Sequence, residues 1–83
     1  MIERTDLTDL LAVDGDSLAL KDETLYRLGP VGTAILEAAA EPIDVDDLVR
    51  TLEETFGTPP EGSVRDAVED QVQQLRTAGL LLP

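Results

Sequence analysis

Short apolar runs alternate with polar turns over the first third of the chain. The segments that separate the runs, Asp14-Gly15-Asp16-Ser17 and Lys21-Asp22-Glu23, have the polar composition of tight turns. Apolar runs this short, joined this closely, predict an antiparallel meander of three strands. A helix over residues 5–12 is an alternative for the first run. The runs are residues 7–13, 18–20 and 24–28.

From residue 30 onward the apolar positions recur at helical spacing. Pro30 suits the first turn of a helix, because the N–H that it lacks would have no partner there. This first helix carries small apolar side chains as far as Ala40, so neighbouring elements can approach it closely. Glu41-Pro42 is expected to end it.

A second helix is predicted between Asp44 and Gly57. Asp44 is the expected N-cap, and Asp47 takes the place of the usual Glu of a capping box. Gly57 suits the position after the last helical turn. Residues 58–62, which are rich in Pro and Gly, are expected to form a loop.

A third helix is predicted from a Ser63 cap to Ala78, with Gly79 ending it and an extended apolar tail following. At least half of its apolar stripe is expected to lie in the core. The stripe consists of Val64, Val68, Val72 and Leu75.

The order of elements predicts an α+β fold: a three-stranded antiparallel sheet followed by three helices, similar to a winged helix-turn-helix. With 83 residues the chain has room for one core. We therefore expect a single domain over residues 1–83, with mainly strands in residues 1–29 and mainly helices in residues 30–83.

Charge removes the functions that a winged helix most often serves. Lys and Arg total 6 and Asp and Glu total 18, a formal net charge of -12. Such a surface repels nucleic-acid phosphate and anionic membranes, so neither is an expected partner. No targeting segment is visible at the start of the sequence, which makes a cytoplasmic location the expectation.

The residue inventory argues against catalysis. The chain contains no Cys and no His, and therefore no thiolate nucleophile, imidazole ligand or neutral-pH proton shuttle. A calcium loop starting at Asp14 fails, because Leu18, Ala19 and Leu25 stand where ligands or a Gly are required. We expect no enzymatic activity, no metal and no cofactor.

Ser17 supports an alternative. Acyl and peptidyl carrier proteins are small and acidic and carry phosphopantetheine on the Ser of Asp-Ser-Leu, which this chain has at residues 16–18. In those carriers, however, the Ser begins a helix, whereas Ser17 follows a predicted turn and enters a strand. A winged helix that binds other proteins, with no role in peptide maturation, is a third interpretation.

Three segments resemble the PqqD-like peptide chaperones of pyrroloquinoline-quinone synthesis and related pathways. They are "TLYRLGPVGTAILEAA", "DVDDLVRTLEETFG" and "VEDQVQQLRTAGLL". No one of these motifs is highly specific, but their order and spacing are similar to the family pattern from about Leu7 to Leu82.

The resemblance implies a RiPP recognition element, a domain that acts on ribosomally synthesised and post-translationally modified peptides. Such a domain binds the leader segment of the precursor peptide and presents the precursor to a modifying enzyme. The leader peptide and that enzyme are therefore the expected partners. In the family the leader adds as a strand beside the third strand and packs on the third helix. An edge strand with free N–H and C=O groups suits this role.

The expected peptide contacts lie on the third strand and the last helix. Within the strand, Tyr26 and Leu28 would share one face with Thr24, and Leu25 and Arg27 the other. Arg27 is one of few cations and could pair with a leader carboxylate, or it could be an ordinary surface residue. The expected peptide-binding residues are Leu25, Tyr26, Arg27, Leu28, Arg65, Val68, Glu69 and Val72.

Overall fold

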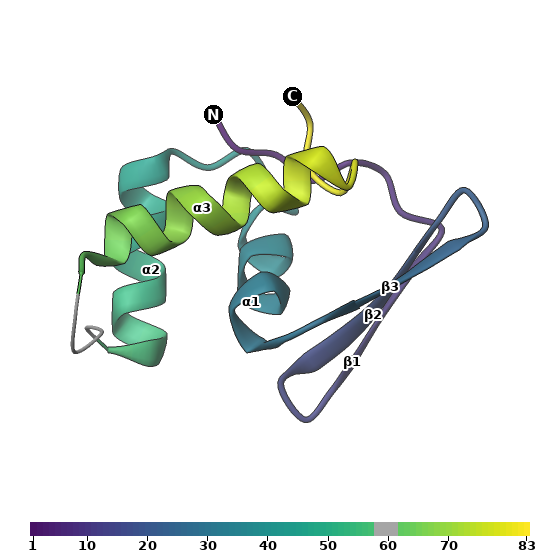
Figure 1. Cartoon of the computed structure of the whole chain (residues 1–83), viewed down its shortest axis with the longest axis horizontal. Coiled ribbons are helices and arrows are strands. Elements are labelled where there is room, and N and C mark those ends of the chain that lie inside the picture. Colours follow the sequence, from purple (N-terminus) through teal and green to yellow (C-terminus); the bar gives the residue numbers. More distant parts are fainter. Residues whose placement is uncertain (58–61) are drawn as a thin grey trace.

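A three-stranded antiparallel meander forms the first part of the computed structural model, which describes residues 1–57 and 62–83. Its strands β1 (Asp9–Val13), β2 (Asp16–Lys21) and β3 (Thr24–Leu28) lie in the order β1-β2-β3 (Figure 1). Residues 9–13 are strand, so the alternative of a helix there is wrong.

Both hairpin turns are two residues long. Asp14 and Gly15 have φ of 52° and 86°, and Asp22 and Glu23 have φ of 49° and 69°. Positive φ at both central positions is the type I′ geometry, whose twist matches that of the flanking strands. Each turn is shorter than the polar segment in the sequence, because Asp16 and Lys21 continue β2.

Three helices follow: α1 (Pro30–Ala38), α2 (Val45–Phe56) and α3 (Val64–Thr77). A three-stranded sheet followed by three helices confirms the predicted α+β class. Among the described residues no helix is long and apolar enough to cross a membrane. The loop expected at residues 58–62 lies largely outside the described residues, which omit 58–61.

The N-caps of α2 and α3 are the predicted residues, but only one of them makes a side-chain capping hydrogen bond. Ser63 caps α3, and its side chain accepts a hydrogen bond from the Asp66 backbone N–H at 3.0 Å. Asp44 is the N-cap of α2, but its side chain makes no capping hydrogen bond, so the predicted capping box does not form. α1 ends at Ala38, earlier than expected.

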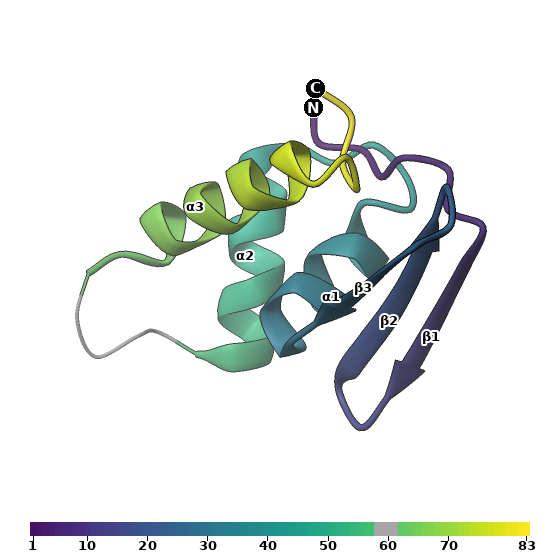
Figure 2. The ribbon, with the colours of Figure 1, turned by 45° about the vertical axis from the view of Figure 1, so that its right-hand side comes forward.

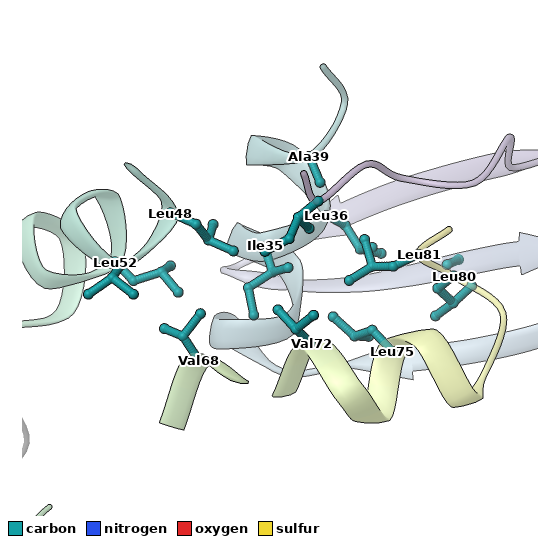
Figure 3. Packing of buried hydrophobic residues seen from close by; sticks show 13 residues of the cluster. Ile35, Leu36, Ala39, Leu48, Leu52, Val68, Val72, Leu75, Leu80 and Leu81 are labelled. Atoms are coloured by element: carbon teal, nitrogen blue, oxygen red, sulfur yellow. The ribbon is translucent and has the colours of Figure 1, made fainter. Parts of the chain in front are cut away.

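The core lies where the three helices meet the sheet and the chain ends. Ile35 and Leu36 of α1, Leu48 and Leu52 of α2 and the inner side of α3 converge there (Figure 3). The α3 side chains are Val68, Val72 and Leu75, which confirms that most of the predicted stripe is core. Leu80 and Leu81 complete the cluster.

The sheet packs on α1 through small side chains. Ser17 and Ala19 of β2 are buried against this helix. The Ser17 and Thr33 hydroxyl oxygens lie 2.8 Å apart and share a hydrogen bond. Since successive strand residues point to opposite faces, Leu18 and Leu20 project from the other side of the sheet.

Candidate functional site

The free edge of β3 is the first component of the candidate site. β3 pairs with β2 on one side, and within the described residues no strand pairs with its other side. Figure 2 shows the sheet with β1 and β3 as its two outer strands. An unpaired edge presents backbone groups that a further strand can use.

The pairing pattern identifies which backbone groups are free. The Leu20 carbonyl accepts a hydrogen bond from the Thr8 N–H at 2.8 Å, so it points toward β1 and away from β3. Its antiparallel partner Leu25 therefore directs its own N–H and C=O to the free edge. The alternation of hydrogen-bonded pairs gives Arg27 the same outward orientation, while Tyr26 bonds to β2.

A cavity of about 420 Å³ adjoins this edge. It lies between β3 and the C-terminal half of α3, with the start of α1 contributing to its wall. Tyr26 and Leu28 are half-buried there and contact the core. The lining residues are Tyr26, Arg27, Leu28, Gly29, Pro30, Val31, Gly32, Gln71, Gln74, Leu75, Ala78 and Leu80. We call this cavity the β3–α3 groove.

Arg27 differs from the other cations. Across residues 1–57 and 62–83 it makes no side-chain hydrogen bond and no salt bridge, although it lines the groove. Lys21, by contrast, donates to the Gly79 carbonyl at 2.7 Å, and Arg4 and Arg76 donate to the carbonyls of Leu36 and Leu82. The Arg27 guanidinium is thus available to an incoming carboxylate.

The predicted α3 contacts lie on other sides of that helix. Arg65 bonds to Asp46 of α2 and lies 3.8 Å from the Glu69 carboxylate, so it faces α2 and not the groove. The hydrogen bond that Arg65 donates to the Asp46 carboxylate raises the pKa of Arg65. Val68 and Val72 are buried. The structure therefore places none of these side chains in the β3–α3 groove, and their peptide-binding role stays a prediction.

Gln71 and Gln74 of α3 and Ala78 at its C-cap are among the groove residues that the sequence did not single out. They follow one another at intervals of three and four residues, and so form a single side of α3 next to the buried stripe. The spacing was visible in the sequence. The sequence did not show on which side of the buried stripe β3 lies, because that depends on how α1 orients the sheet.

Ser17 does not have the geometry of a carrier serine. It lies inside β2, its side chain is 2% exposed, and its hydroxyl is bonded to Thr33. Attaching phosphopantetheine would require opening the contact between β2 and α1. The structure thus gives no support to the carrier alternative.

An open strand edge beside a partly apolar groove is an arrangement by which domains add an extended peptide to a sheet. The comparison with known families agrees with this class. The family model described as coenzyme PQQ synthesis protein D (PqqD) matches residues 6–81. The chain therefore belongs to the PqqD family, whose members are RiPP recognition elements and non-catalytic accessory proteins of PQQ synthesis. No curated protein and no solved structure matched the chain.

Proposed function

We propose that this domain is a winged-helix-like, non-catalytic binding protein for precursor peptides. It binds the leader segment of a ribosomally synthesised precursor as an added strand on β3 and presents the precursor to a modifying enzyme. The unpaired edge of β3 above the β3–α3 groove is the observation that carries this proposal.

Backbone pairing supplies one part of the affinity. Leu25 and Arg27 each offer an outward N–H and C=O, and a net contribution of about 0.5–1.5 kcal/mol is typical of one such hydrogen bond. These bonds involve no charge, so a negative domain can form them with peptides of many compositions. Selectivity must then come from side chains.

The groove supplies that selectivity. Alternate residues of an added strand point to the same face, so every second leader side chain would enter the space between β3 and α3. Leu28, Val31 and Ala78 offer apolar contact, and the amides of Gln71 and Gln74 offer hydrogen bonds. Arg27 would bind a leader carboxylate near the edge. A leader with alternating apolar residues and at least one acidic residue fits this surface.

Substitution of Arg27 tests the added strand. Arg27→Pro removes the outward N–H that the leader would accept from, whereas Arg27→Ala keeps it and removes only the guanidinium. We expect Arg27→Pro to weaken binding of a precursor leader, taken from any short reading frame found next to the gene, by about tenfold or more, and Arg27→Ala by less. Amide chemical-shift titration of the labelled domain measures both affinities.

The same titration locates the site. Shifts should concentrate at residues 25–28 and at Gln71, Gln74 and Ala78. Circular dichroism of each variant confirms that the fold is kept. Shifts confined to α1 and the Asp14–Ser17 region, with β3 and α3 silent, would contradict the proposal.

A further inference from the structure

The outer face of the sheet, opposite the helices, carries a second surface. We define the outer sheet face by the side chains that β1, β2 and β3 direct away from α1. Leu11, Val13 and Leu25 are 55%, 54% and 63% exposed, and Leu18 is also exposed. The members of this face are Asp9, Leu11, Val13, Asp16, Leu18, Leu20, Leu25 and Arg27.

The polarity of β2 is the reverse of what burial alone would give. An antiparallel sheet with one solvated face ordinarily points apolar residues inward and polar residues outward. Here the inward residues are Ser17, Ala19 and Lys21, whereas both leucines of β2, Leu18 and Leu20, point outward together with Asp16. Contiguous exposed apolar surface of this kind marks an interaction site.

Acidic residues border the apolar centre. A hollow of about 460 Å³ on this face is lined by Leu11, Val13 and Leu18 together with Asp14 and Asp16. Neither carboxylate forms a salt bridge within the part of the chain that the structure describes. The complementary partner surface is an apolar patch edged by Lys or Arg.

We propose that the outer sheet face is where the peptide-modifying enzyme docks, through an apolar patch ringed by basic residues. This proposal rests on the proposed function, and continuity between the two surfaces supports it. Arg27 lines both the hollow and the β3–α3 groove. An enzyme on this face would therefore lie beside a leader held on the edge of β3, without covering the groove.

A second copy of the chain fits this face less well. Face-to-face pairing would bring two molecules of net charge -12 together and set the Asp14 and Asp16 carboxylates of both against one surface. The leader peptide has its own proposed site on the edge of β3 and in the β3–α3 groove, so it is not needed to cover the outer sheet face. Charge therefore favours a basic partner protein.

Leu11→Asp tests the docking surface. Leu11 is on β1, the strand farthest from the groove, so the change should leave leader affinity within about twofold. It should weaken binding of a peptide-modifying enzyme, taken from any reading frame for such an enzyme found next to the gene, by about tenfold or more. Phe56→Asp is the matched control: it makes the same kind of change at an exposed apolar residue of α2 and should alter neither affinity. Leu11→Thr, which keeps a strand-forming residue, provides a milder variant if Leu11→Asp does not fold.

Each outcome has one meaning. Enzyme affinity of the folded Leu11 variant equal to that of the wild type overturns the proposal, as does a loss of leader affinity equal to the loss of enzyme affinity. A wild-type dimer in sedimentation that Leu11→Asp makes monomeric would assign the face to a second copy instead. If the wild-type domain does not bind the leader at all, the leader titration alone shows that the proposed function has failed.

Discussion

At the scale of single residues, the buried hydroxyl pair between β2 and α1 sets how closely the sheet and the helices approach. Ser17 and Thr33 are both buried, and each satisfies the other across 2.8 Å. A larger side chain at either position would push the sheet off the helix. The pair thus fixes the position of β3 relative to α3, and with it the width of the groove.

Thr33→Val should destabilise the protein by about 1–3 kcal/mol, because it leaves the Ser17 hydroxyl buried without a partner. Adding Ser17→Ala removes that unpaired hydroxyl, so the double variant should recover part of the loss. Urea unfolding of Thr33→Val, Ser17→Ala and the double variant measures the free energy of unfolding of each.

Thr55→Val is the control for this pair. Thr55 lies exposed on α2, where such a change typically alters stability by less than about 0.5 kcal/mol. If the destabilisations caused by Ser17→Ala and Thr33→Val simply add in the double variant, the two hydroxyls are not energetically coupled, which contradicts the prediction.

At the scale of secondary-structure elements, α3 has three distinct sides. One is buried in the core, one carries Arg65 and Glu69 beside α2, and one carries Gln71 and Gln74 at the groove. Gln73 lies on the side away from the groove, next to the cavity lined by Met1 and Asp44. These sides give a direct test of where the peptide lies.

Gln71→Trp should fill part of the β3–α3 groove and reduce leader affinity by about tenfold or more, because the indole takes the space of leader side chains. Gln73→Trp places the same bulk on the other side of the helix and should leave the affinity unchanged. Fluorescence anisotropy of a labelled leader compares the two variants. A loss with Gln73→Trp, or with Arg65→Ala, and none with Gln71→Trp would instead place the peptide on the α2 side of α3.

The elements themselves were largely predictable from the sequence. Period-two alternation within residues 24–28 indicated that Tyr26 and Leu28 share one face of the strand, and helical spacing located α2 and α3. The α3 half of the site was harder to predict, since periodicity identifies a buried stripe but not which neighbour flanks it. The sequence also did not reveal that β2 points Ser17 and Ala19 inward and its leucines outward. Close packing against α1, rather than hydrophobicity, favours these small side chains on the inner face.

At the scale of the whole molecule, the excess of carboxylates decides which partners can approach. Most of the cations donate to carboxylates or to backbone carbonyls within the described chain, so little positive charge is left for an external anion. Arg27 is isolated on the sheet and makes no basic patch with a neighbour. A phosphate backbone needs several such contacts.

The domain should therefore not bind duplex DNA at physiological salt. The net charge of -12 opposes the approach of phosphate, and α3 offers Arg65 and Arg76 against Asp66, Glu69 and Asp70. Anisotropy titration with random-sequence duplex DNA measures this. Binding below micromolar concentration would show that locally clustered cations outweigh the net charge.

The vacant side of β3 also has a consequence for the protein before any peptide arrives. The backbone N–H and C=O groups that would pair with a leader could equally pair with β3 of another molecule. Such pairing is the first step of edge-to-edge aggregation. Mutual repulsion between strongly negative molecules opposes that encounter, and β3 is only five residues long. The acidity of the surface thus opposes aggregation through β3 and allows its edge to stay unpaired, as binding of the proposed leader requires.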